Sequence, residues 1–451
     1  LGQRSITNDA FRREWSARGK AFNSARTFKT DTRQIEAYDR STWFRASPLR
    51  GETVSNLRGA APVQVILHVF RPMPFLMRRY PVLALHLPLS AVYSNACHTF
   101  SESDLPMSSP QAVPVFDGHN DVLLRLKLSG HPSPERLFVD GDTVGHIDLP
   151  RAKKGGLAGG LCAIFVPSPQ GFDANRDFIA PEQTQALATT LGMASLLFRI
   201  EAASNGGLKV CRRAADIRNA MADGAFASVL HIEGVEAFDT DLDALHVLHQ
   251  SGLRSLGPVW SRPNSFAYGV PFRFPSTPDI GPGLTDAGKR LVKTCNELKV
   301  LVDLSHMNEQ GFWDIAKITD APLVASHSNA HTLCNHSRNL TDRQLDAIRD
   351  SGGLAGINFG VLFMRQDGVK NPDTDLSELV RHVDYMVDRM GIDHVAMGSD
   401  FDGTTIPAAM KDASDLQMLV NALRDAGYDQ ASLDKICHGN WIRVLEKTWG
   451  A

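Results

Sequence analysis

Cysteine is scarce and scattered in this sequence. The 451 residues include six cysteines, none spaced as a CxxC pair, at positions 97, 162, 211, 295, 334 and 437. This spacing excludes a CxxC metal or redox motif, and it favours a reducing environment in which the thiols are incidental.

A strong net charge and long apolar runs are also missing. The formal net charge of −3 gives no field that would recruit nucleic acid or an anionic membrane surface. No uninterrupted apolar run approaches the ~20 residues that span a bilayer. We therefore expect no nucleic-acid partner and no membrane anchor. What is present, 43% hydrophobic and 22% charged residues, is the composition of an ordinary globular enzyme.

Residues 1–106 differ from the rest of the chain. They carry 15 Lys and Arg against 8 Asp and Glu, whereas the remainder carries 32 against 42. Pro and Arg interrupt their apolar runs, so no helical or strand period is sustained. We expect a poorly structured N-terminal extension or a mis-assigned start, with the natural chain beginning near Met107 and one domain over 107–451. A cytoplasmic location follows from that start.

The segment between Met77 and Ala96 allows a different interpretation. A basic start, a short apolar middle and small residues at its end loosely resemble a secretory signal, although His86 and Pro88 interrupt the apolar part. On that interpretation the protein is secreted or periplasmic.

Eight short apolar runs follow residue 107, separated by longer amphipathic stretches. The runs are Pro114–Asp117, Gly160–Val166, Ala227–Glu233, Leu253–Trp260, Val300–Ser305, Leu323–His327, Leu354–Phe359 and His394–Ser399. Strands that read as continuous apolar runs with helical crossovers predict a parallel sheet, and eight of them predict a closed (β/α)8 TIM-type barrel. An open doubly wound sheet is the alternative, but the first run is not followed by the glycine-rich phosphate loop usual in such a sheet.

Side chains of types that bind metals stand at the end of five of these runs or just after it. They are His119, Asp121, Glu233, His306, His327 and Asp400. In a (β/α)8 barrel, functional side chains project from the C-terminal strand ends onto one face. Several carboxylates buried together are costly without cations, so we expect a metal site there, with two ions.

The donor types narrow the metal. Imidazole and carboxylate without thiolate suit zinc, with manganese, cobalt or iron as alternatives. Two Zn²⁺ per chain need five or six donors if one carboxylate bridges them. Glu233 lies in the middle of the set and is the natural bridge, which leaves Asp400 free to move a proton.

At this point the sequence resembles a known family, the membrane (renal) dipeptidases, which are binuclear zinc peptidases with an amidohydrolase-like barrel. The resemblance spans about 112 to 448. It is carried by Asp117-Gly-His-Asn-Asp121, Glu233-Gly234, Asp303-Leu-Ser-His306, Ser326-His-Ser-Asn-Ala330, Ser337-Arg-Asn339, Gly398-Ser-Asp-Phe-Asp-Gly403 and Asn440-Trp-Ile-Arg-Val444.

The resemblance implies a role for each matching residue. His119 and Asp121 would bind one zinc, His306 and His327 the other, and Glu233 both. It also implies that Arg338 anchors the substrate's terminal carboxylate and that Asp400 is the catalytic acid/base. Family members often form dimers, so a homodimer is an expectation as well.

One position departs from the family pattern. The family usually has a histidine after the fourth strand that helps to hold the scissile carbonyl oxygen, and Trp260 stands at the corresponding place here. Arg262, Asn264 or a metal ion alone are the candidates to replace that histidine.

Together these features predict metal-assisted hydrolysis of dipeptides, with a D-residue at the C-terminal side as one form of the substrate. Two alternatives remain. One is another amidohydrolase-type metal hydrolase, such as a lactonase, deaminase or phosphotriesterase, although several of these use a bridging lysine that the strand ends here lack. The other is a non-catalytic metal- or peptide-binding relative, which would have no need of Asp400.

Overall fold

The computed structural model of the protein describes residues 112–169, 171–173 and 177–450. The expected N-terminal extension, the start at Met107, and the signal-like segment between Met77 and Ala96 lie outside these residues. Within the described part, the five cysteines are all buried and unbridged, which fits incidental thiols.

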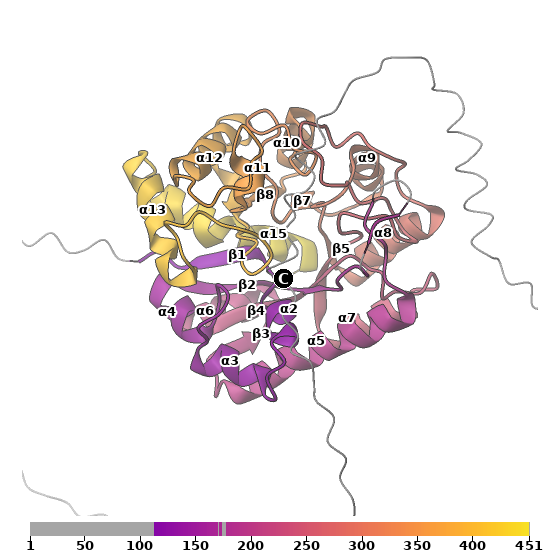
Figure 1. Ribbon diagram of the computed structural model, residues 1–451, viewed down its shortest axis with the longest axis horizontal. Helices are drawn as coiled ribbons and strands as arrows, with labels where there is room; N and C mark the ends of the chain where they lie inside the picture. Colours follow the sequence, from indigo (N-terminus) through magenta and orange to yellow (C-terminus); the bar gives the residue numbers. More distant parts are fainter. Residues whose placement is uncertain (1–111, 170, 174–176, 451) are drawn as a thin grey trace, which may run out of the picture. The chain divides into compact units, whose positions relative to one another are not determined.

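In the described residues, eight parallel strands close into a ring. Helices lie around these strands (Figure 1). The strands are β1 (Val115–Asn120), β2 (Leu157–Phe165), β4 (Phe226–Glu233), β5 (Leu253–Gly257), β6 (Leu301–Val302), β7 (Val324–Ala325), β8 (Leu354–Ile357) and β9 (Val395–Met397). Neighbouring strands pair in this order, and single parallel bridges, Asp303 with Val324 and Asn120 with Phe401, join the two sheets into one ring. The predicted (β/α)8 barrel is confirmed.

The strands differ from the predicted runs mainly in length. β6 and β7 have two residues each, because the chain leaves the ladder as soon as it approaches the polar residues that follow. A further short strand, β3 (Leu208–Val210), pairs with the start of β4. It is too short to give a readable period.

The helices fill the crossovers. They are α2 (Val122–Leu128), α3 (Pro134–Asp140), α4 (Leu149–Gly155), α5 (Gln183–Ala203), α6 (Ala214–Ala222), α7 (Asp243–Ser251), α8 (Asp286–Leu298), α9 (Glu309–Ile318), α10 (Asp342–Asp350), α11 (Val361–Met364), α12 (Ser377–Met390), α13 (Leu416–Asp425), α14 (Gln430–Asp434) and α15 (Asn440–Trp449). Short helical turns complete them: 3-10 turns at Ile392–His394 and Ala413–Asp415, and a π-helical turn at Lys435–Gly439.

By length and composition, α5 is apolar enough to cross a membrane. In this fold it packs against β2 and β3 and buries Met193, Leu197 and Ile200. These contacts are those of an outer helix of the barrel.

The strands are buried on both faces, as their continuous apolar runs predict. Along β4, Phe226, Leu230 and Ile232 belong to the layer between the strands and the outer helices. Ala227 and Val229 belong to a second cluster with Trp441 of α15. Because side chains alternate along a strand, the second cluster marks the inner face, and it fills one end of the barrel.

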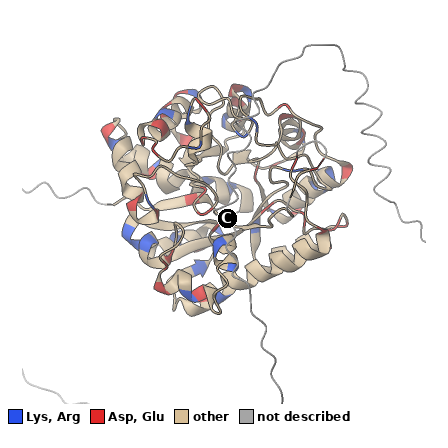
Figure 2. Ribbon diagram, viewed as in Figure 1, with Lys and Arg blue, Asp and Glu red and all other residues tan. Residues whose placement is uncertain are grey.

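Charged residues lie mostly on the outer helices. Figure 2 shows Lys and Arg interspersed with Asp and Glu along them. Several form ion pairs, for example Arg218 with Glu446 and Arg389 with Asp346.

Candidate metal centre

Each predicted site residue lies at or just beyond the C-terminal end of a barrel strand, or in the loop that follows. His119 is in β1 and Glu233 ends β4. The others lie two to four residues beyond the end of a strand: Trp260 after β5, His306 after β6, His327 after β7 and Asp400 after β9. Arg338 lies between β7 and α10. The structure therefore brings them to one mouth of the barrel.

The first donor set consists of His119, Asp121 and Glu233. β1 ends at Asn120, so Asp121 is the N-terminal cap residue of α2 rather than a strand residue. The three side chains nevertheless lie close together: Nε2 of His119 lies 3.6 Å from Oδ2 of Asp121 and 3.8 Å from Oε1 of Glu233.

The second donor set consists of Glu233, His306 and His327. Nε2 of His306 lies 2.9 Å, and Nε2 of His327 3.4 Å, from the same Oε1 atom of Glu233. The two Nε2 atoms are 3.1 Å apart. Glu233 is thus shared by two triads whose potential ligand atoms each lie within 4.8 Å of one another.

These donors fit metal ions. Two ligands of one zinc, each about 2.1 Å from the ion in a tetrahedral arrangement, lie about 3.4 Å apart, close to the spacings within both sets. Four buried polar atoms here have no hydrogen-bond partner among the described residues: Nδ1 and Nε2 of His119, Oδ1 of Asp121 and Oε1 of Glu233. Buried polar groups are normally satisfied, so this cluster of unpartnered atoms indicates a cation site.

The electrostatics of the cluster point the same way. Burial raises the pKa of Glu233, and the neighbouring carboxylates Asp121 and Asp400 add to the rise. Burial disfavours the charged form of His119, but Glu233, Asp121 and Asp400 outweigh it and raise the pKa of His119 to about 10. The carboxylates therefore draw a proton onto His119 when no cation is there to balance them.

His306 and His327, the two histidines of the second donor set, are held in the neutral form. Burial and the charge of Arg338 hold the pKa of His306 well below its usual range, and burial with His119 and Arg338 does the same for His327. A neutral imidazole is the form that binds a metal.

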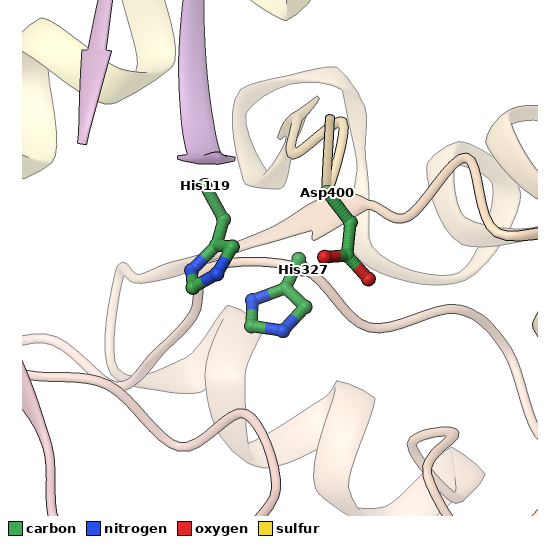
Figure 3. A group of neighbouring side chains, drawn as sticks. All are labelled: His119, His327 and Asp400. Carbon is green, nitrogen blue, oxygen red and sulfur yellow. The ribbon is translucent and has the colours of Figure 1, made fainter. Parts of the chain in front are cut away.

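Asp400 faces the same cluster from β9. Figure 3 shows its carboxylate turned towards the imidazole rings of His119 and His327, whose centroids are 3.9 Å apart. One oxygen of Asp400 lies within 4.8 Å of a nitrogen of each ring, and Oδ2 accepts a hydrogen bond from Asn358 at 2.9 Å. Burial raises the pKa of Asp400, which suits a group that gives and takes a proton.

The backbone around Asp400 is held in an unusual conformation. Asp400 has φ 58° and His306 has φ 64°, a region that non-glycine residues adopt with strain. Asp117 stabilises the turn, because its carboxylate accepts hydrogen bonds from the backbone N–H and the hydroxyl of Ser399 at 2.6 and 2.8 Å. A side chain at Gly403 would overlap the carboxylates of Asp121 and Asp400.

A layer of polar residues to which the sequence patterns assigned no role supports the histidines. The Oγ of Ser261 lies 2.7 Å from Nδ1 of His306, and the Oγ of Ser326 lies 2.7 Å from Nδ1 of His327. Asp303 accepts hydrogen bonds from the backbone N–H and hydroxyl of Ser326. Such outer partners fix which ring nitrogen faces a metal.

His231 belongs to the same layer. It lies two residues before Glu233 on the inner face of β4, with Nδ1 2.9 Å from the hydroxyl of Ser255 and Nε2 3.7 Å from Oδ2 of Asp303. Its ring is edge-on to His119 at 5.5 Å, so it lies directly below the donors. Side chains two residues apart on a strand share a face, so the position of Glu233 would have predicted that His231 lies on the same face.

Arg338 is buried beside this centre. Its guanidinium donates to the hydroxyl of Ser328 and to the backbone oxygen of His327, both at 3.0 Å, while its Nε has no partner among the described residues. Burial lowers the pKa of Arg338 to about 10, partly offset by Asp400 and Glu233. A fixed cation with an unused donor is suited to an anionic group of a ligand.

Trp260 lies beside His306, with the centres of the two rings 5.8 Å apart. The two residues considered as replacements for the missing histidine are both engaged elsewhere. Arg262 is fully buried and paired with Glu236 at 2.7 Å. Asn264 donates to the backbone of Pro258 and accepts from two backbone N–H groups of its own loop.

Comparison with known proteins agrees with this geometry. The family described as Membrane dipeptidase (Peptidase family M19) matches residues 110–449. A metallopeptidase from Rhodobacter sphaeroides, solved with a phosphinate mimic of the dipeptide L-Ala-D-Ala, is 51% identical with a TM-score of 0.72, over 75% of this chain and 100% of that chain.

More distant relatives extend the match. A dipeptidase of Claviceps purpurea is 28% identical over 80% of this chain and 82% of its own length. A probable dipeptidase from Pseudomonas aeruginosa, 24% identical with a TM-score of 0.65 over 75% of this chain and 96% of that chain, shares the fold. The chain therefore belongs to the membrane dipeptidase family of metallopeptidases.

Proposed function

We propose that the protein is a zinc-dependent dipeptidase that uses two Zn²⁺ ions and accepts dipeptides with a D-residue at the C-terminal position. The observation that carries the proposal is the shared Oε1 atom of Glu233, within 3.8 Å of an imidazole nitrogen from each of His119, His306 and His327. The D-residue is suggested by the L-Ala-D-Ala mimic bound by the Rhodobacter sphaeroides relative.

The proposed metal ligands form two sets that share Glu233. His119 and Asp121 would hold one ion, His306 and His327 the other, and Glu233 both. When bound, such ions make a water nucleophilic near neutral pH and polarise the scissile carbonyl. Arg262 and Asn264 do not take over the missing histidine's contact with that carbonyl, since both are engaged within the protein.

Asp400 would pass a proton to the leaving amine. Its raised pKa and its position towards His119 and His327 support this role. Arg338 would hold the terminal carboxylate through its planar fork, which restricts the substrate to short peptides. The cytoplasmic location and a homodimer stay predictions, because they rest on the start at Met107 and on the resemblance alone.

The test is hydrolysis of L-Ala-D-Ala and L-Ala-L-Ala before and after chelation, with zinc then added back. We expect chelation to abolish cleavage and zinc to restore it. Cleavage that survives complete metal removal, or no cleavage of any dipeptide by the zinc-containing protein, would refute the proposal. In the latter case another amidohydrolase substrate or a binding role would remain.

A further inference from the structure

Aromatic rings gather around Trp260, beside the metal centre. The ring of Trp260 lies 5.0 Å from Phe165, 4.8 Å from Phe178 and 5.4 Å from Phe272. These residues come from the end of β2, from the segment after it and from the long loop after β5. All four residues are half-buried.

The cluster, here called the aromatic wall, is fixed from behind. The guanidinium of Arg262 lies 5.2 Å from the ring centre of Phe165 and 5.3 Å from that of Trp260. It also donates to Glu236, to the hydroxyl of Ser168 and to the backbone of Val166. Its charge is therefore balanced within the protein by Glu236, and the four aromatic side chains of the wall are apolar.

The wall continues to the proposed carboxylate anchor. Phe363 lies 5.6 Å from the guanidinium of Arg338 and 5.9 Å from Phe272, which in turn contacts Trp260. His306 lies alongside, 6.2 Å from Phe272 and 5.8 Å from Trp260. Trp260 is thus at the end of the row of rings away from Arg338, with a proposed metal ligand beside it.

We infer that Trp260, Phe165, Phe178 and Phe272 form an apolar subsite for the side chain of the substrate's N-terminal residue. The inference rests on the proposed function, which directs the terminal carboxylate to Arg338 and the scissile bond to the metal centre. The N-terminal residue then extends past His306 to the Trp260 end of the wall. A bulky apolar side chain there buries ring surface, whereas a charged one loses water without gaining a partner.

The experiment compares dipeptides X-D-Ala in which X is Ala, Leu or Asp. For the zinc-containing wild type we expect kcat/KM to be at least about tenfold higher for Leu than for Ala, since each buried methylene adds about fourfold. We expect the value for Asp to be lowest. Phosphinate analogues of the same three peptides, which are not cleaved, should bind in the same order when measured by calorimetry.

Variants separate the wall from other effects. Trp260→Ala and Phe272→Ala, from two different segments, should each reduce the Leu-over-Ala ratio to within about threefold of one. The matched control is Trp313→Ala, a half-buried tryptophan on α9 that packs on Phe312 and Arg343; it should leave the ratio unchanged.

Each alternative outcome has a distinct meaning. Cleavage of Ala-D-Ala with no preference for X, or a preference that survives in both wall variants, would overturn the inference and leave the proposed function intact. A preference for bulky residues at the C-terminal position instead would overturn the placement. If no dipeptide is cleaved and no analogue binds, the proposed function itself fails.

Discussion

The two ends of β4 differ in the side chains that they place on the inner face of the barrel. On its inner face Ala227 and Val229 pack in an apolar cluster with Trp441 of α15, whereas His231 and Glu233 reach the mouth. The apolar end is filled and satisfied: the indole N–H of Trp441 donates to the backbone of Met397 at 2.8 Å. The polar end holds unpartnered buried atoms, including Oε1 of Glu233.

The apolar end of β4 stabilises the barrel, whereas the polar end carries a proposed metal ligand. Burying apolar side chains favours folding, whereas burying carboxylates and imidazoles without partners opposes it. A fold tolerates such a mouth when a ligand balances the charges, which here would be two metal ions. Substitutions at the two ends should therefore differ in which property they change.

The largest expected effect follows from Glu233→Gln. The amide has no charge and would be a poor bridge, so we expect the metal content to fall below one ion per chain and dipeptide hydrolysis to become undetectable. The metal-free variant should unfold at the same or a higher urea concentration than the metal-free wild type, because a buried carboxylate has been removed. Elemental analysis and urea titration measure both; full metal content with full activity would contradict the bridging role.

The next effect is that of Asp400→Asn. Losing a general acid/base lowers kcat by about 10²–10⁴-fold. Both ions should stay bound, because the two donor sets proposed around Glu233 do not include Asp400. Steady-state kinetics with metal analysis of the same sample tests this. An unchanged kcat would rule Asp400 out as the acid/base, and loss of metal would assign it as a ligand.

A smaller effect is expected from Arg338→Lys. Lysine keeps the charge but loses the planar fork, and a hydrogen bond to a charged group contributes about 1.5–3 kcal/mol, so kcat/KM should fall about 10–100-fold, mainly through KM. A dipeptide amide, which has no terminal carboxylate, is the control substrate. The variant and the wild type should cleave it equally well, and a loss of similar size on the amide would argue against carboxylate recognition.

At the apolar end, Val229→Ala should change stability alone. The cavity left on the inner face of β4 should cost about 2 kcal/mol of unfolding free energy, whereas metal content and kcat per folded molecule should stay at wild-type values. Val229 is four residues from Glu233 on the same face, so this pair tests the division directly. If the variant keeps its stability but loses metal, the apolar end of β4 does not act on stability alone.

Much of the barrel could be predicted because parallel strands buried on both faces read as apolar runs. The positions of His119, Glu233 and Asp400 followed from the rule that functional groups gather at C-terminal strand ends. β3 could not be found, because three residues carry no period. The lengths of β6 and β7 were overestimated, since the mainly polar residues that follow each two-residue strand belong to irregular backbone.

The surroundings of the site were harder to predict than its donors. Ser261 meets His306 across 45 residues, and Asn358 meets Asp400 across 42. Small polar residues in separate loops give no pattern that would link them. In the same way, Trp260 was visible as a departure from a family motif, but the rings around it come from three separate segments.

We propose that Glu233 joins two metal sites at the mouth of the barrel. The most direct test is anomalous diffraction at the zinc absorption edge from crystals of the zinc-containing protein. We expect two peaks about 3.5–4 Å apart. One should lie beside His119 and Asp121 and the other beside His306 and His327, with the Glu233 carboxylate between them. A single peak, or peaks that do not contact Glu233, would contradict it.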